Sequence, residues 1–353
     1  FWRSATHWIG GVGIIVFALS VLPSIGKVGM ILYRAEMSPI AMANFRYRTQ
    51  KTLHIIMMIY AGLTLLEIIA LMLCGMNLFD AITHSFATIA TGGFSPKNIS
   101  IAYYNSLAVE VVIMIFMLLS GINFGLLFLT VSGKILVLLR STVVRYYLIA
   151  ILAGVIASAV NLHGSVYTDW FDAFRYASFQ LISIGTSTGF ATTDSNLWPP
   201  FSKLLIIFFT LQCACSASTS GGIKVDRIVL FWQALWKRIK KVQHANAVVK
   251  VKVDNVTVED DTIEASIVYI LLYLFIVFVS ALIISGLGLD IMTAFSAAAA
   301  TMGNVGPGFG SVGSVSNFSQ IPELAKWILT GDMLLGRLEI FGLLLLFLMK
   351  TWR

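Results

Sequence analysis

Three segments of the chain share one unusual pattern, a semi-apolar stretch that opens on an aspartate and ends in small, glycine-containing residues. They are residues 80–94, 172–190 and 290–307. The pattern predicts a short helix, which the aspartate would cap, followed by extended backbone. Non-helical backbone at membrane depth is tolerated only where it is buried in protein or lines water. We therefore expect re-entrant segments that line an ion pore and aim backbone carbonyls at a dehydrated cation.

The composition places the chain in a lipid bilayer. Hydrophobic residues make up 58% of the 353 residues and charged residues only 12%, whereas soluble domains average about 25% charged residues. The three cysteines form neither an even-numbered framework nor a CxxC pair, so we expect no disulfide or metal role for them. The stretches long enough to span a membrane are approximately 8–26, 53–75, 107–133, 146–163, 203–222, 263–287 and 326–349.

The basic residues are distributed unevenly between the connections. Of the 24 Lys and Arg residues, the connections 27–52, 134–145 and 223–262 hold five, three and eight, and 350–353 holds two more. By the positive-inside rule these connections are cytoplasmic, and the three glycine-rich segments enter the membrane from outside. Because the charges follow membrane sidedness, we do not expect nucleic-acid binding.

The order of span, re-entrant segment and span repeats along the chain. Residues 53–140 form repeat 2, residues 141–262 form repeat 3 with a basic cytoplasmic loop, and residues 263–353 form repeat 4. Residues 1–52 supply the second helix of repeat 1 and a cytoplasmic loop. This order predicts an all-α integral membrane fold of tandem helix–pore-loop–helix repeats, arranged pseudo-fourfold around a central pore. Ring closure requires a fourth re-entrant segment, which we expect upstream of Phe1.

The chemistry of the small-residue stretches favours potassium, with sodium as the competing ion. These stretches contain no ionised side chain, whereas a divalent-cation filter would be expected to carry carboxylates and an anion pore basic residues. Glycine relieves the backbone strain of aligned carbonyls. The predicted potassium-binding filter residues are Ala90, Thr91, Gly92, Gly93, Thr186, Ser187, Thr188, Gly189, Gly303, Asn304, Val305 and Gly306. We expect no covalently bound cofactor.

Two further features interrupt predicted spans and suggest a gate. Residues 213–222 have little helix propensity, which indicates a flexible intramembrane loop beneath the filter or, alternatively, an ordinary small-residue helix end. Arg337 lies inside the last predicted span, where an arginine is costly and usually functional, although pairing with Asp332 or Glu339 is an alternative. If both features lie at one depth, they close the pore together. The predicted gate residues are Arg337, Ser216, Ser218, Thr219, Ser220, Gly221 and Gly222.

Several weaker signals complete the sequence analysis. His84 is expected to cap or pack, and Glu110 to be solvated or paired at the outer surface, with a role at the pore mouth as the alternative. Alternating valine and lysine at 248–253 predict a short hairpin, and the basic connections 27–52 and 223–262 could dock a cytosolic regulator. Broken helices also occur in secondary transporters, but their repeats are often inverted, whereas these run parallel. No residue set indicates an enzyme.

The residues that carry a family resemblance lie along the whole chain: 1–14 (FWRSATHWIGGVGI), the three filter segments, 218–227 (STSGGIKVDR) and 336–340 (GRLEI). They resemble the Trk/Ktr/HKT superfamily of potassium transporters and, within it, the TrkH-type subunits. The resemblance implies potassium uptake across the bacterial inner membrane by a homodimer, with a filter glycine in each repeat, here Gly93, Gly189 and Gly306. It also implies that the 213–222 loop and Arg337 obstruct the pore, and that a cytosolic TrkA-like nucleotide-binding ring is the regulatory partner. A sodium-permeable or cation-coupled secondary transporter is the alternative.

Overall fold

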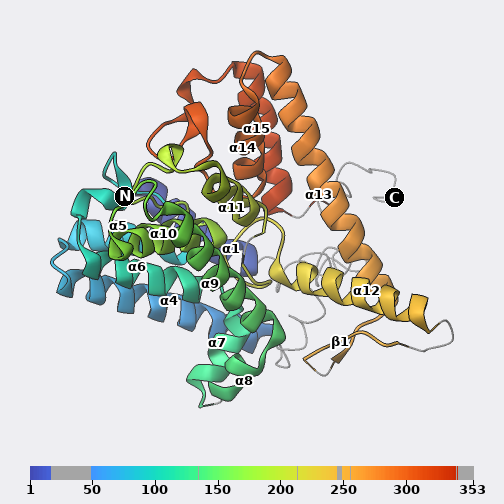
Figure 1. Cartoon of the computed structure of the whole chain (residues 1–353). Helices are drawn as coiled ribbons and strands as arrows, with labels where there is room; N and C mark the ends of the chain where they lie inside the picture. Colours follow the sequence, from blue (N-terminus) through green and yellow to red (C-terminus); the bar gives the residue numbers. More distant parts are fainter. Residues whose placement is uncertain are drawn as a thin grey trace, which may run out of the picture.

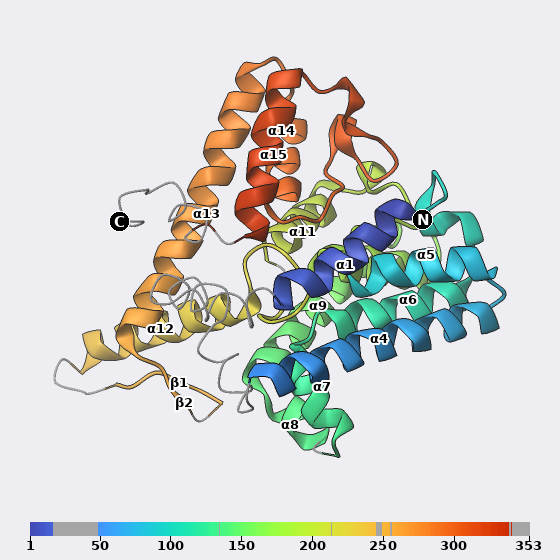
Figure 2. The ribbon, with the colours of Figure 1, turned by 180° about the vertical axis from the view of Figure 1, so that it is seen from behind.

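The computed structural model describes residues 1–16, 49–133, 135–212, 214–244, 249–254, 256–338 and 340. These residues form helices and one two-stranded hairpin (Figure 1). The first helix, α1 (Trp2–Val16), covers the start of the predicted span 8–26, whose remainder lies outside the described residues. Seen from behind, α1 lies beside α5 (Leu78–Ile89) (Figure 2).

Repeat 2 begins with the long helix α4 (Thr49–Leu73), followed by α5 and the 3₁₀ helix η3 (Ser100–Tyr104). The predicted span 107–133 is wrong as a continuous helix, because α6 (Leu107–Ser120) and α7 (Phe124–Val131) meet at an angle of 106°. Asn123 caps the new helix, since its side-chain oxygen accepts hydrogen bonds from the N–H groups of Gly125 and Leu126. The short α8 (Ile135–Arg140) then leads to repeat 3.

Repeat 3 contains α9 (Thr142–Leu162), α10 (Trp170–Gly185), the 3₁₀ helix η4 (Ser195–Leu197) and α11 (Pro200–Leu211). The predicted span 203–222 is therefore wrong in its second half, since the helix ends at Leu211. The predicted basic loop contains the helix α12 (Val225–Gln243). The predicted hairpin is confirmed as β1 (Lys252–Val253) and β2 (Val256–Thr257), which pair antiparallel.

Repeat 4 contains α13 (Asp260–Gly286), α14 (Ile291–Met302), the 3₁₀ helices η5 (Gly310–Val312) and η6 (Phe318–Gln320), and α15 (Glu323–Arg337). The predicted span 326–349 runs beyond α15 into residues outside the described part. Arg337 is the last residue of α15.

Within the described part of the chain, three helices are long and apolar enough to cross a membrane, by length and composition. They are α4 over Ile56–Leu73, α9 and α13, and the bent α6–α7 pair would make a fourth. α13 is apolar on both faces. Tyr269 and Tyr273 are buried against the protein, whereas Phe275 and Phe278 are exposed. Aromatic side chains that face outward along a helix of membrane-spanning length are favourable in contact with lipid. The described residues therefore form a membrane protein built on repeated helix–loop–helix units.

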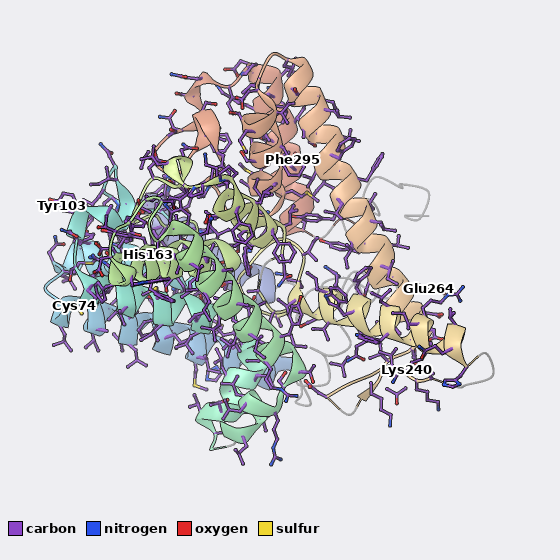
Figure 3. All side chains as sticks on the ribbon, in the orientation of Figure 1. Cys74, Tyr103, His163, Lys240, Glu264 and Phe295 are labelled. Carbon is purple, nitrogen blue, oxygen red and sulfur yellow. The ribbon has the colours of Figure 1, made fainter. Side chains whose placement is uncertain are left out.

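Different helices and side chains lie at the two ends of the molecule. Lys240 on α12 and Glu264 on α13 lie at one end, and Cys74 and Tyr103 lie at the other (Figure 3). The first turns of α4, α9 and α13 all lie toward the end of the molecule that carries α12, so the three long helices run in the same general direction (Figure 1). The short helices α5, α10 and α14 follow them and run back into the molecule.

Candidate ion pathway

Each short helix begins with a different cap. Asn77 caps α5 and Asp290 caps α14, because each side chain accepts a hydrogen bond from the N–H three residues later, at 2.8 Å from Asp80 and 3.0 Å from Thr293. The hydroxyl and the N–H of Thr293 hold the pKa of Asp290 below its usual value. The N-cap of α10 is Asp169. The prediction of an aspartate cap is thus right for Asp290 and wrong for Asp80 and Asp172.

The chain leaves each short helix through the same left-handed turn. The turn places one residue at φ 52°, 55° or 54° and a glycine two residues later at φ 64°, 86° or 103°. These pairs are Thr91 and Gly93, Ser187 and Gly189, and Asn304 and Gly306. A left-handed φ costs an ordinary residue free energy but costs glycine almost none. The three-fold sequence pattern is therefore a three-fold backbone pattern.

Hydrogen bonds repeat with the turn. In each segment the residue before the glycine donates its N–H to a carbonyl five residues earlier, in the last turn of the helix. The bonds are Gly92 to Ala87 at 2.7 Å, Thr188 to Ser183 at 2.9 Å, and Val305 to Ala300 at 2.9 Å. Because the C=O of a trans peptide points opposite to its N–H, the carbonyls of Thr91, Ser187 and Asn304 face away from the helix end.

The three segments are packed against one another in chain order. A Cβ placed on Gly93 would lie closer than 3.0 Å to the carbonyl oxygen of Thr188, and one on Gly189 would lie equally close to that of Val305. Real Cβ atoms essentially never approach so closely. The turn of repeat 2 therefore contacts the turn of repeat 3, and that of repeat 3 contacts repeat 4. Next to Gly306, by contrast, a Cβ would meet no atom within 4 Å.

The 213–222 stretch is non-helical where the structure describes it, and it lies against the ends of all three short helices. The Thr219 hydroxyl donates to the Ile89 carbonyl at 2.9 Å, and the Thr91 hydroxyl donates to the Thr219 carbonyl at 3.0 Å. The Gly221 N–H donates to Ser187 Oγ at 3.1 Å. Of the two readings of this stretch, the non-helical loop agrees with the structure and the helix end does not.

The loop also reaches repeat 4 and its own following helix. A Cβ on Gly221 would lie 2.8 Å from the carbonyl oxygen of Gly303. Ser220 Oγ lies 2.8 Å from Ser187 Oγ, and the Lys224 amine, next to the start of α12, donates to the Ser220 carbonyl. The described residues of the loop are buried except Ala217, which is partly exposed. It connects the three turns to α12.

Arg337 lies at the same loop. Its guanidinium donates to the carbonyl of Thr219, the same oxygen that accepts the Thr91 hydroxyl. Gly336 makes this position possible, because a Cβ there would clash with the carbonyl of Met302 at the end of α14. Asp332 instead accepts a hydrogen bond from Ser280 at 2.9 Å, and the pairing of Arg337 with Asp332 is not formed. Glu339, the other alternative partner, lies outside the described residues.

The comparisons with known proteins agree with this geometry. A family model described as "TrkH: Cation transport protein" matches residues 1–352. The chain belongs to the TrkH family. It is 40% identical over 356 residues to the "Trk system potassium uptake protein TrkH" of Escherichia coli K12, and 33% identical to the TrkG protein of the same strain, in each case over 100% of this chain and 73% of the relative.

A solved structure is similar as well. The crystal structure of the potassium transporter TrkH from Vibrio parahaemolyticus matches with a TM-score of 0.87 at 35% identity, over 100% of this chain and 73% of that chain. Similarity at this level covers the arrangement of the helices and short helices together. The family resemblance and the all-α repeat fold predicted from sequence are confirmed.

A polar network surrounds the N-terminal end of α5. The Asp80 carboxylate accepts a hydrogen bond from the Tyr104 hydroxyl at 2.7 Å and forms an ion pair with Lys97 at 3.2 Å. Burial and this carboxylate raise the pKa of Tyr104. His84 is fully buried, with Nδ1 2.7 Å from the Asp80 carbonyl and Nε2 3.0 Å from Ser95 Oγ. The packed histidine predicted from sequence is present.

Sequence reasoning missed several residues of this site. Gly336 and Lys224 lie inside the motifs 336–340 and 218–227 that carry the family resemblance, but the sequence assigned neither of them a contact. Glu110 was left open between solvation and pairing, and the structure pairs it with Arg175 at 2.7 Å. A single arginine in a short helix of a membrane segment is the signal that could have found the pair.

Proposed function

We propose that this protein takes up potassium through a pore lined by backbone carbonyls of the three turns. The observation that supports this most directly is the contact of Gly93 with the Thr188 carbonyl and of Gly189 with the Val305 carbonyl. The residues assigned to the filter are those named from the sequence, at 90–93, 186–189 and 303–306. The family and the names of the relatives agree with potassium as the transported ion. No chemical transformation is involved.

The electrostatics of the site suit a monovalent cation. The helices α5, α10 and α14 all direct their C-terminal ends at the turns, and the C-terminal end of a helix carries partial negative charge. Neutral carbonyl oxygens replace the hydration shell of a potassium ion without binding it too strongly for release. The hydroxyls of Thr91 and Ser187 are engaged by the 213–222 loop, so the backbone oxygens are the ligands in this proposal.

The loop and Arg337 form the gate in this proposal. The Thr219 carbonyl is held by two donors, one from the turn of repeat 2 and one from α15. A positive charge beside the pathway repels cations, and the loop occupies space next to all three turns. Opening of the pore requires the Thr219 carbonyl to lose its hydrogen bonds from Thr91 and Arg337. The helix α12 follows the loop directly in the chain and can pull on it.

The proposal also covers the membrane, the oligomeric state and the regulatory partner of the protein. We place the protein in the bacterial inner membrane as a multi-pass homodimer, with the turns reached from outside and α12 on the cytoplasmic side. A TrkA-like nucleotide-binding ring would bind there and act through α12. The repeat boundaries 53–140, 141–262 and 263–353 belong to this proposal, as does the contribution of 1–52 to repeat 1.

The transport function is tested with the purified protein in liposomes. Under an outward potassium gradient, we expect uptake of labelled rubidium that external potassium inhibits and external sodium at equal concentration does not. Liposomes without protein supply the background. Uptake of labelled sodium at the same rate as rubidium would contradict potassium selectivity and favour the sodium-permeable alternative.

The sidedness is tested by cysteine labelling in whole cells, in a background whose native cysteines are replaced by serine. A Lys240→Cys variant should react with a membrane-impermeant maleimide only after the cells are permeabilised. A Thr168→Cys variant, on the exposed connection between α9 and α10, should react in intact cells. Labelling of Lys240→Cys from outside would invert the proposed topology.

A further inference from the structure

An ion pair crosses the boundary between repeats 2 and 3. Glu110 lies in the first turn of α6 and Arg175 in the second turn of α10. The guanidinium donates from Nε to Oε2 and from Nη2 to Oε1, both at 2.7 Å. The side chain of Arg175 is 13% exposed and that of Glu110 is 2% exposed. The two groups form a parallel fork, the geometry in which an arginine fixes both the distance and the angle of a carboxylate.

The other repeats carry no such group at the corresponding place. Aligned on the left-handed residues Thr91, Ser187 and Asn304, Arg175 corresponds to Phe79 and Met292, each twelve residues earlier. Phe79 is 54% exposed and Met292 is 41% exposed. Repeat 3 thus has a partly buried cation, paired with the buried Glu110, where the other two repeats present an exposed apolar side chain. Its short helix is also longer, with 16 residues against 12 in α5 and α14.

The pair is better suited to fixing geometry than to adding stability. Two charges taken out of water lose hydration that their attraction repays only in part, and apolar residues of similar size often stabilise a protein as well. Removing one partner is costly because the other charge is then buried alone. A buried fork therefore tolerates only one relative position of the two helices that carry it.

The helix that Arg175 fixes carries the turn of repeat 3 at its other end. The same boundary contains the contact of Gly93 with the Thr188 carbonyl, and a backbone bond from the Ala102 N–H to the Ala191 carbonyl at 3.2 Å. The boundary between repeats 3 and 4 is held differently, by neutral bonds such as that from the Gly310 N–H to Asn196 Oδ1 at 2.9 Å. Among the described residues, the charged fork belongs to the first boundary.

We propose that Glu110 and Arg175 are a positioning pair that sets the spacing between the filter turns of repeats 2 and 3, and through it the discrimination between potassium and sodium. The inference rests on the proposed potassium pathway. Neither residue contacts the ion. They act through α10, whose position determines where the carbonyl of Thr188 stands relative to Gly93.

The test measures the rubidium-to-sodium permeation ratio in liposomes beside the melting temperature in detergent. Arg175→Lys keeps the charge but loses the planar fork, and Glu110→Gln keeps the shape but loses the charge. We expect each to lower the ratio about tenfold, which corresponds to ~1.4 kcal/mol between the two ions, with Arg175→Lys melting near the parent. Lys203→Gln, which removes an outer charge that has no ion pair within the described chain, is the control and should leave the ratio unchanged.

The outcomes separate the possible roles. An unchanged ratio in folded Arg175→Lys and Glu110→Gln would overturn the positioning role and leave a purely structural pair. Failure of the conservative Arg175→Lys variant to fold would also overturn it, because the pair would then maintain the fold itself. A parent protein that passes sodium as readily as rubidium would refute the proposed function, whereas a selective parent with unaltered variants would refute only this inference.

Discussion

Replacing Gly189 with serine should lower the rubidium-to-sodium permeation ratio of the reconstituted protein by about tenfold, equivalent to ~1.4 kcal/mol between the ions. A Cβ at this position would lie closer than 3.0 Å to the Val305 carbonyl oxygen, and the backbone stands at φ 86°. The side chain can be accommodated only if the turns of repeats 3 and 4 move apart. Carbonyls that are spread apart coordinate a dehydrated potassium ion less well and reject sodium less well.

Two other glycines make matched comparisons for this substitution. Gly288 has φ 98° but no atom within 4 Å of an added Cβ, and it lies outside the turns. Gly288→Ser should therefore lower stability slightly and leave the ratio unchanged. Gly93→Ser should act like Gly189→Ser, because its Cβ would meet the Thr188 carbonyl. Unchanged selectivity in both turn variants, with normal folding, would show that these carbonyls do not bind the ion.

The turns could be predicted from sequence because their geometry is local. A glycine two residues after a threonine, serine or asparagine, at the end of a short apolar stretch, requires only a helix that stops and a left-handed turn. The same residues repeat in the same place in three units, so a chance pattern becomes improbable. Which turn contacts which neighbour was not predictable, because the approach of Gly93 to Thr188 depends on the packing of helices far apart in the sequence.

The errors in the predicted spans have physical causes that hydropathy does not register. Residues 107–133 are mostly apolar, yet Asn123 satisfies the first N–H groups of a new helix and permits a bend of 106°. The helix at 225–243 was predicted as a loop because its lysines and arginines lower its hydropathy, although they suit the last turns of a helix. Both features depend on backbone hydrogen bonding rather than on average polarity.

The parts of the proposed gate were predictable from sequence, but their contacts were not. Low helix propensity predicted the loop, and the cost of a membrane-buried arginine singled out Arg337. That Thr219 is the residue held by both Thr91 and Arg337 follows only from the structure. The sequence kept pairing with Asp332 or Glu339 as the alternative, and in the structure the Ser280 hydroxyl donates to the Asp332 carboxylate instead.

Replacing Arg337 with alanine should raise rubidium flux about tenfold without changing the rubidium-to-sodium ratio. The guanidinium donates a charge-assisted hydrogen bond to the Thr219 carbonyl, and such bonds contribute about 1.5–3 kcal/mol. Its loss weakens the closed position of the loop and removes a positive charge from beside the pathway. The filter turns keep their own hydrogen bonds, so selectivity is expected to remain. Initial rates in liposomes, at matched protein content, measure both quantities.

Deleting residues 216–218 should produce the same phenotype by a separate route, since the shortened loop cannot bring Thr219 to both of its donors. Lys326→Ala is the control for Arg337→Ala, because Lys326 lies on the same helix and pairs only with the exposed Glu323. Arg337→Lys should raise flux less than Arg337→Ala, as it retains the charge but loses the guanidinium geometry. If the alanine and deletion variants fold normally and conduct like the parent, Arg337 holds α15 against the loop for structure alone and the gate lies elsewhere.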